Sequence, residues 1–353
     1  MPYATPDDDI TQIIDAPGTP ISYLAPGGRH LAFVHYQPHP PIAMLARTYL
    51  PLAGLRVDPV LRARRRLRRY TAISVLRIED GRELVLTLPA GAQAGMPVWA
   101  PDGSRFAFTL DREDGVGVWL ADAETGQAQE VPGLTICDIL GGEPSSDGGA
   151  LRWSRDGQAL LALTVPVDRP EPPPGTIEPR IEETAGKRSQ AATFQDLLAT
   201  AAGEATFEAL ATSVPCRVDP VTGHQAPLGP AGLYYAIVDS PDQAYLLVHR
   251  LRRPFSFRVP WFWFARESLV ADAGGRQLAV IAGLPVSDEV PRQGVPAGPR
   301  LIGWVERAPA TLAWMEALDG GDPVAPAEHR DRVWQFAAPF TGEPRQAFDM
   351  RQR

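Results

Sequence analysis

A short phrase of turn and strand residues recurs along the chain and constrains its fold more than any other feature. Its clearest copy is "VWAPDGSRFAFT" at Val98–Thr109. Pro101 fixes the first turn position, Asp102 can cap the turn with its side chain, and Gly103 accepts a positive φ. The strand that follows is apolar on both faces, so it must be covered on both sides. Looser copies are "YLAPGGRHLAFVHY" from Tyr23, "LRWSRDGQALLALTV" from Leu151 and "VDSPDQAYLLVHRL" from Val238.

A second phrase follows the first and completes a four-stranded unit. It reads strand, turn, strand in "VGVWLADAETGQAQEV", and similar phrases begin at Cys216, Ser268 and Arg332. Proline, 37 of 353 residues, is about twice as frequent as the usual ~5%, which favours short strands and turns. About four short antiparallel strands per repeat are typical of a β-propeller blade. We therefore predict an all-β chain, residues 1–353 forming a single β-propeller region of four-stranded antiparallel blades. About five blades are present, which leaves open an incomplete seven- or eight-bladed ring.

Two partly helical insertions interrupt the predicted blades, at about 37–70 and 170–212. In the first, "IAMLARTYL" predicts a short helix from Ile42. The second opens as a polyproline segment, and Thr193 is a predicted helix N-cap before "FQDLLA", with another helical turn at "TFEALA". Insertions on a repeat scaffold carry function or serve only as packing pieces, and both interpretations stay open here.

The insertions and the segments around them resemble a known family. The carrying motifs are "PPIAMLARTYLPLAGLRVDP", "IEPRIEETAGKRSQAATFQDLLA", "ATSVPCRVDPVTG", "RRPFSFRVPWFWF" and "LDGGDP". From about Ile10 to Phe348 the chain is similar to the glutamyl endopeptidase branch of the prolyl oligopeptidase family. One departure is "LRARRRLRRYT", which is more basic than the corresponding segment of relatives. The resemblance implies an N-terminal propeller that caps a C-terminal α/β-hydrolase domain with a Ser-Asp-His triad and admits peptides.

The chemistry of such a hydrolase is not found in this sequence. A nucleophilic serine needs a Gly-x-Ser-x-Gly elbow between a strand and a helix. The nearest stretch, "GGEPSSDGG" at Gly141–Gly149, lacks the glycine two residues before Ser146, and no alternating βαβ pattern surrounds it. We therefore expect no catalytic residue and no hydrolase domain in this chain, and no activity from it alone. The triad would lie downstream, so we expect a truncated product or the propeller piece of a split enzyme. The partner would then be the missing hydrolase domain, joined in cis or supplied as a separate chain.

Metal and cofactor sites are not predicted. The six histidines show no metal-ligand spacing, and no GxGxxG or Walker-type loop is present. Cys137 and Cys216 lie far apart without a CxxC motif, as expected of two buried reduced thiols.

The charge balance argues against nucleic acid as a partner. The formal net charge is −8, whereas phosphate binding needs a basic surface, and the stretch from Arg62 to Tyr70 is the one local exception. The N-terminus has no signal-peptide pattern, and no apolar run approaches the ~18 residues that span a bilayer. We expect a soluble cytoplasmic protein without a membrane partner.

The resemblance also suggests substrate contacts. If the parent enzyme cleaves peptides after glutamate, arginines should bind the substrate carboxylate, and the candidates are Arg180, Arg188 and Arg253. For each of them a structural salt bridge or a solvated surface position is the alternative. The aromatic group Phe255, Phe257, Trp261, Phe262, Trp263 and Phe264 is expected to form blade core or interdomain packing, with a cavity wall as the alternative.

Two functions therefore stay in competition. The first is the substrate-gating propeller of a glutamyl endopeptidase-like serine peptidase, with a peptide as substrate of the complete enzyme. The second is a stand-alone TolB-like propeller that acts as a binding or scaffold module, since the turn repeat is shared with such proteins. A five-bladed enzyme with its own site has no candidate constellation in the sequence.

Overall fold

A computed structural model describes residues 6–14, 16–37, 39, 42–66, 69–141, 149–172, 194–291 and 293–353. The chain divides into two compact units, which are described separately. Unit 1 comprises Met1–Thr48, Arg66–Glu113 and Gly117–Val131, and unit 2 comprises Tyr49–Arg65, Asp114–Val116 and Pro132–Arg353.

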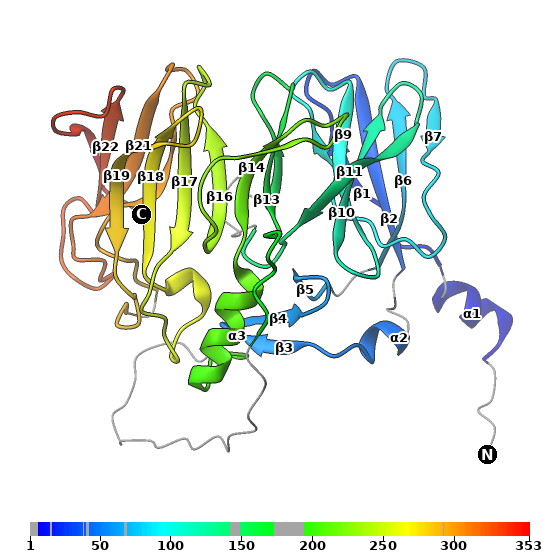
Figure 1. Cartoon of the computed structure of the whole chain (residues 1–353), viewed down its shortest axis with the longest axis horizontal. Coiled ribbons are helices and arrows are strands. Elements are labelled where there is room, and N and C mark those ends of the chain that lie inside the picture. Colours follow the sequence, from blue (N-terminus) through cyan, green and yellow to red (C-terminus); the bar gives the residue numbers. More distant parts are fainter. Residues whose placement is uncertain are drawn as a thin grey trace. The chain divides into compact units, whose positions relative to one another are not determined.

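Five antiparallel meanders of four strands each contain most of the strands of the described residues (Figure 1). The first sheet holds β1 (Ile21–Leu24), β2 (His30–Gln37), β6 (Arg69–Arg77) and β7 (Glu83–Val85). The second holds β8 (Val98–Trp99), β9 (Arg105–Asp111), β10 (Val116–Asp122) and β11 (Ala128–Ile136). The third holds β12 (Leu151–Trp153), β13 (Leu160–Thr164), β14 (Val214–Val218) and β15 (Gln225–Pro227). The fourth holds β16 (Tyr234–Asp239), β17 (Tyr245–Leu251), β18 (Arg266–Asp272) and β19 (Gln277–Leu284). The fifth holds β20 (Arg300–Trp304), β21 (Thr311–Ala317), β22 (Asp331–Ala337) and β23 (Arg345–Met350).

These sheets confirm the prediction of an all-β chain with about five four-stranded antiparallel blades. The second and third sheets are joined at one residue pair, where Ile136 at the end of β11 meets Thr164 of β13.

The recurring turn and strand have the predicted structure. Gly103 has a φ of +69°, and the Ser104 amide donates to the Asp102 carboxylate at 3.0 Å. In β9 after this turn, Phe106 and Phe108 are fully buried, as is the residue between them, which points to the other face. The strand is therefore covered on both sides, as the repeat predicts.

In unit 2, glycines in two hairpin turns allow neighbouring sheets to approach closely. Gly275, between β18 and β19, has a φ of +88°, and a Cβ there would lie 2.2 Å from the carbonyl oxygen of Leu228, just beyond β15. Gly223, between β14 and β15, is equivalent, because a Cβ there would lie 1.9 Å from the carbonyl oxygen of Pro132 in β11. Each turn thus abuts the backbone of the preceding sheet. Only glycine fits such a position.

The cores lie between the sheets. In unit 1, buried residues of the first sheet such as Val34 and Ile73 pack with Phe106 and Phe108 of the second. In unit 2, the fourth and fifth sheets bury a cluster that includes Leu247, Val270, Leu312, Trp314 and Phe340. In each of these two pairs, the sheets depend on one another for burial, as expected of repeats that cannot bury their faces alone.

The two insertions form separate small elements. The first contributes α2 (Ile42–Leu45) and a three-stranded sheet of β3 (Leu50–Leu52), β4 (Leu55–Asp58) and β5 (Ala63–Arg64). The second contributes α3 (Ala201–Ala211), and a further short helix, α1 (Asp8–Ile14), precedes β1. No helix among the described residues is long and apolar enough to cross a bilayer.

The predicted helices are only partly confirmed. The helix from Ile42 ends at Leu45, because Leu50–Leu52 is drawn into β3 and pairs with β4. The helical turn at "TFEALA" is confirmed within α3. The helix over "FQDLLA" is wrong, since these residues are irregular and the α3 N-cap is Thr200, whose Oγ1 accepts from the Gly203 amide at 3.0 Å. Thr193 lies outside the described residues.

Long-range contacts explain why the "FQDLLA" segment is not helical. Asp196 has a φ of +57°, its carbonyl accepts from the Gly54 amide at 2.8 Å, and its carboxylate accepts from Arg56 Nε at 2.9 Å. These bonds to the first insertion hold the backbone in a left-handed conformation that a helix cannot contain.

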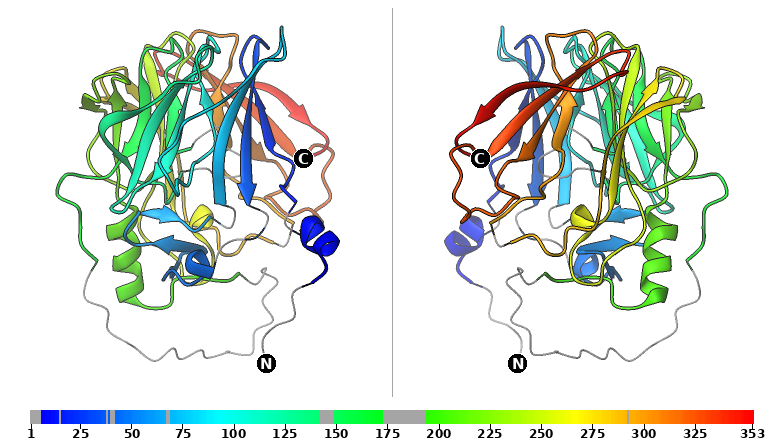
Figure 2. Two further views of the ribbon diagram at one scale, coloured as in Figure 1. Left: turned by 90° about the vertical axis from the view of Figure 1, so that its right-hand side faces the viewer. Right: turned by 90° about the vertical axis from the view of Figure 1, so that its left-hand side faces the viewer.

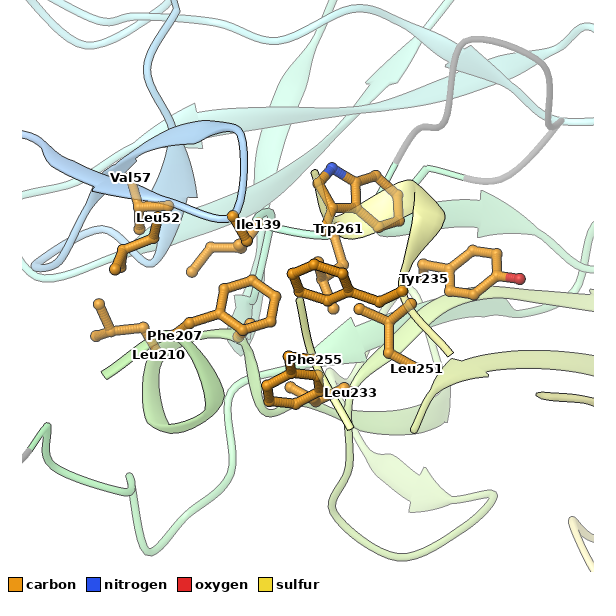
Figure 3. Packing of buried hydrophobic residues seen from close by; sticks show 14 of the residues in the cluster. Leu52, Val57, Ile139, Phe207, Leu210, Leu233, Tyr235, Leu251, Phe255 and Trp261 are labelled. Carbon is orange, nitrogen blue, oxygen red and sulfur yellow. The ribbon is translucent and has the colours of Figure 1, made fainter. Parts of the chain in front are cut away.

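The two insertions share one hydrophobic core within unit 2 (Figure 3). Phe207 and Leu210 of α3 pack with Leu52 and Val57 of the first insertion, and residues of the fourth sheet and its loops complete the cluster. Figures 1 and 2 show α3 beside β3 and β4. Phe207 is fully buried, with its ring edge-on to Phe255 at 5.5 Å. The segments of the two insertions that belong to this cluster are thus packed together.

Candidate functional site

A cavity of about 730 Å³ lies in unit 2 and is bordered by the third, fourth and fifth sheets. Its basic lining residues are Arg152, Arg155, Arg266, Arg300 and Arg353. Among the residues that the structure describes, the lining carboxylates are those of Glu306 and Asp331. Aromatic walls come from Tyr235, Phe262, Trp263 and Trp304. The volume is typical of small-ligand sites, which run from about 300 to 1,000 Å³.

Arg155 is fixed at one side of the cavity by a two-pronged ion pair. Its two terminal nitrogens contact the Glu306 carboxylate at 2.5 and 2.8 Å. Its Nε donates to the Asp239 carbonyl at 3.2 Å, and its backbone amide donates to the Asp239 carboxylate at 2.7 Å. The bonds from Arg155 lower the pKa of Glu306, with a further contribution from the charge of Arg152. Glu306 is therefore ionised at neutral pH and neutralises Arg155.

A second ion cluster closes the side formed by the fifth sheet. Asp331 accepts from Arg300, and from Arg353 Nε at 3.1 Å. Arg353 also donates to Asp319 at 2.5 Å, and Arg330 donates to the same carboxylate at 2.8 Å. Burial alone would raise the pKa of Asp319, but the bonds from Arg353 and Arg330 outweigh it and hold the pKa at about 2. Both carboxylates are almost completely covered, so these pairs fix the wall.

The fourth sheet contributes a histidine, a serine and an arginine from two paired strands. His249 of β17 lies opposite Ser268 of β18, and its Nδ1 is 2.8 Å from the Ser268 Oγ. The ring stacks on Tyr235 at 5.4 Å. Burial and the positive charge of Arg266 lower the pKa of His249 to about 4, so the imidazole is neutral at pH 7. Arg266, two residues before Ser268, lies on the same face of β18.

The aromatic group predicted from the sequence divides between core and cavity. Phe255, Trp261 and Phe264 are buried in the core that the insertions share. Phe262 and Trp263 line the cavity, and both contact Phe194, with ring centroids 6.5 and 6.2 Å away. Phe257 is half exposed. Both interpretations of this group therefore hold, each for a different subset of its residues.

Arg253, the predicted substrate-contacting arginine that the structure describes, does not line this cavity. Arg253 contacts Glu204 and Glu208 of α3 at 2.5 and 2.6 Å, and its guanidinium lies 4.9 Å from the Phe255 ring centroid. These contacts are those of a structural salt bridge, which was the alternative role given for Arg253 above. Contact of Arg253 with a substrate stays a prediction. Arg180 and Arg188 lie outside the described residues, as does Ser146.

Two arginines of the locally basic stretch, Arg62 and Arg64, make contacts within unit 2. Arg62 is buried and donates to the Pro170 carbonyl at 2.7 Å. Arg64 donates to the Ile139 carbonyl at 2.5 Å and lies over the Trp261 ring. These arginines tie the first insertion to the second and to the fourth sheet. These two arginines therefore have structural contacts.

Both cysteines are buried away from any described cluster of metal-ligating side chains. Cys137 and Cys216 are both buried free thiols, and burial raises the pKa of Cys137 to about 12. Within the described part of the chain, no group of three or more His, Cys, Asp or Glu side chains is arranged to hold a metal ion.

Comparisons with known proteins place the chain in a family. No protein-family model matches it. The "Probable glutamyl endopeptidase, chloroplastic" of Oryza sativa subsp. japonica is 30% identical over 366 residues, which cover 97% of this chain and 38% of the relative. The chain belongs to the glutamyl endopeptidase branch of the prolyl oligopeptidase family.

A second curated relative gives the same picture of coverage. The Arabidopsis thaliana "Probable glutamyl endopeptidase, chloroplastic" is 32% identical over 361 residues, covering 97% of this chain and 36% of the relative. The solved Pyrococcus horikoshii acylaminoacyl peptidase is 13% identical, with a TM-score of 0.46 over 93% of this chain and 39% of that one. The present chain thus spans less than two fifths of the length of the curated glutamyl endopeptidases that it matches.

The cavity arginines were not predicted from the sequence. They come from three different sheets, and no local motif joins them. The spacing of Arg266 and Ser268 at i and i+2, in a strand paired with the one that holds His249, is the one local pattern that could have indicated them.

Proposed function

We propose that the chain forms the substrate-gating propeller of a glutamyl endopeptidase-like serine peptidase. The carrying observation is the 30–32% identity to two such endopeptidases over 97% of the chain, which includes the insertions as well as the strand repeats. In this proposal residues 1–353 are one propeller region with insertions at about 37–70 and 170–212. The bond-breaking residues belong to an α/β-hydrolase domain, joined in cis or supplied as a separate chain.

The insertion core supports this proposal over a scaffold propeller without a site. The family-like segment "RRPFSFRVPWFWF" places Trp261 and Phe264 in the core of the insertions and Phe262 and Trp263 at the cavity wall. One segment thus ties the insertions to the cavity. A rigid support of this kind is what a binding site needs to hold its geometry.

The predicted contacts of Arg180, Arg188 and Arg253 with a substrate carboxylate are part of the proposal. Arg253 can serve only by exchanging a bond to Glu204 or Glu208 for one to the substrate. Because its side chain is 52% exposed, replacing it with Gln should cost less than about 1 kcal/mol of stability. A larger loss of peptide cleavage than of stability in the assembled enzyme would support the contact.

The test is assembly with a hydrolase domain. The hydrolase domain of the rice relative, expressed separately, is mixed with this chain, and association and cleavage of a glutamyl peptide are measured. We expect a complex whose cleavage is blocked by a serine-directed inhibitor, and no turnover by this chain alone. Turnover by the chain alone that the same inhibitor abolishes would contradict the proposal. If this chain neither associates with the hydrolase domain nor affects its cleavage of the peptide, the TolB-like binding module would be favoured.

A further inference from the structure

Part of the aromatic wall of the cavity lies in a long connection between two strands of the fourth sheet. Residues 252–265 join β17 to β18 and contain the short 3₁₀ helix η1 (Trp261–Trp263). Phe262 and Trp263 line the cavity from this helix. At its end, the Trp263 carbonyl accepts from the amide of Ser287, just after β19, at 2.9 Å. A binding site keeps its geometry only where its surroundings support such a segment.

The tip of the β3–β4 hairpin, Ala53–Gly54, holds the beginning of η1. Ala53 and Gly54 have φ values of +53° and +82°, the two positive values typical of a two-residue type I′ turn. The Ala53 carbonyl accepts from the Trp261 amide at 2.9 Å. This bond satisfies the first N–H of a helix whose N-cap, Pro260, makes no side-chain cap bond. A Cβ at Gly54 would lie 2.4 Å from the Pro260 Cβ, so the hairpin tip and the start of η1 are in direct contact.

The same hairpin also supports the rings of the wall through the second insertion. The Gly54 amide donates to the Asp196 carbonyl at 2.8 Å, and Arg56 Nε donates to the Asp196 carboxylate at 2.9 Å. Two residues before Asp196, the Phe194 ring lies 6.5 and 6.2 Å from the ring centroids of the two wall residues of η1. Holding Asp196 in place therefore also holds the phenylalanine that packs against the wall.

We propose that the hairpin tip and Arg56 of the first insertion are positioning elements for the aromatic wall of the cavity. They fix Phe262 and Trp263, the tip through the start of η1 and Arg56 through the second insertion. The inference rests on the proposed function in one respect, because it takes the cavity to lie on the substrate path of the assembled peptidase. The Arg56 side chain is 49% exposed, so its bond can be removed while the buried core stays filled.

Fluorine NMR of the full chain tests the positioning without any hydrolase domain. The chain is labelled with 5-fluorotryptophan, and each resonance is assigned by its loss in the corresponding Trp→Phe variant. In Arg56→Gln we expect the Trp263 resonance to move by more than its linewidth. The resonances of Trp314 and Trp334 in the fifth sheet should stay in place, because general destabilisation is not the cause of the movement.

A matched control breaks the same kind of bond elsewhere in unit 2. Arg276 Nε donates to the Asp272 carboxylate at 2.9 Å, in a turn that does not line the cavity. Arg276→Gln should therefore leave the Trp263 resonance unmoved. Asp196→Asn removes the partner of Arg56, and combining it with Arg56→Gln should move Trp263 no further than either change alone, since both act through one bond.

A second pair of variants tests the contact of the hairpin tip. Gly54→Ala should also move the Trp263 resonance, because its Cβ must displace Pro260. Its control is Gly342→Ala, at a φ of +89° with no heavy atom within 4 Å of the Cβ position. This control adds the same backbone strain without the contact, so it should leave Trp263 unmoved.

Kinetics of the assembled enzyme test the consequence for substrate. A displaced wall should alter substrate binding more than the chemical step. Arg56→Gln should raise the KM for a glutamyl peptide by about threefold or more and change kcat by less than about twofold, whereas Arg276→Gln should change neither.

Four results would overturn the inference: an unmoved Trp263 resonance in Arg56→Gln, an equal movement in Arg276→Gln, movement of all tryptophan resonances together in Arg56→Gln, or an unchanged KM in the assembled Arg56→Gln enzyme. A chain that fails to assemble with the hydrolase domain refutes the proposed function, and the NMR result still decides the positioning. A chain that assembles while Trp263 is unmoved in Arg56→Gln refutes only the positioning.

Discussion

The close approach of neighbouring sheets at Gly275 can be tested with three glycine-to-alanine variants in unit 2. Gly275 combines a φ of +88° with a Cβ position 2.2 Å from the Leu228 carbonyl oxygen. Gly342, in the corresponding turn of the fifth sheet, has a φ of +89° and no heavy atom within 4 Å of its Cβ position. Gly274 has neither feature, since its nearest atom is 3.5 Å away. The three positions therefore separate backbone strain from steric overlap.

The expected magnitudes follow from these two terms. A left-handed conformation costs an alanine about 1–2 kcal/mol, and the lower entropy of the unfolded chain returns about 0.5 kcal/mol. Gly342→Ala should therefore lose about 0.5–1.5 kcal/mol. Gly275→Ala must also displace the backbone at Leu228, just beyond β15, at an added cost of about 1–3 kcal/mol, so its total loss should be about 1.5–4.5 kcal/mol. Gly274→Ala should change stability by less than about 0.5 kcal/mol.

Urea unfolding followed by tryptophan fluorescence measures all three, because six of the eight tryptophans belong to unit 2. Equal losses in Gly275→Ala and Gly342→Ala would refute the reasoning. Backbone strain alone would then explain both losses, and the turn at Gly275 would not approach the Leu228 carbonyl as closely as described.

Two further predictions concern the insertion core and the ion cluster. Phe207→Ala should destabilise unit 2 by about 3–5 kcal/mol in the same assay, while Phe257→Ala, at a 47%-exposed phenylalanine, should cost less than about 1 kcal/mol; similar losses would contradict the packing of α3. Since Arg353 and Arg330 hold the pKa of Asp319 at about 2, below its unfolded value of about 3.9, its stabilising contribution is complete above pH 4 and is lost as the pH falls towards 2. Asp319→Asn should lower stability at pH 7 and flatten the decline between pH 4 and 2, and an unchanged pH profile of unfolding would contradict the cluster.

Features that are determined by neighbouring residues could be predicted from the sequence, whereas features that depend on distant contacts could not. The turn around Gly103 and the two-faced strand after it are encoded within a dozen residues, so the blades could be predicted. The start of α3 could not be, because Asp196 is held by Arg56, 140 residues earlier. The cavity arginines come from three sheets, and only the folded chain brings them together. The family motifs, in contrast, pointed to the correct relatives because they were read as whole segments.

The shared core of the two insertions has a consequence for synthesis. Leu52 and Val57 leave the ribosome about 150 residues before Phe207 and Leu210, the helix residues that cover them. At about 5–20 residues per second, this delay is roughly 8–30 s. During that time the first insertion presents an unfilled apolar surface on a nascent chain. We expect this interval to be the stage at which chaperones bind, and the completion of α3 to be the step that releases them.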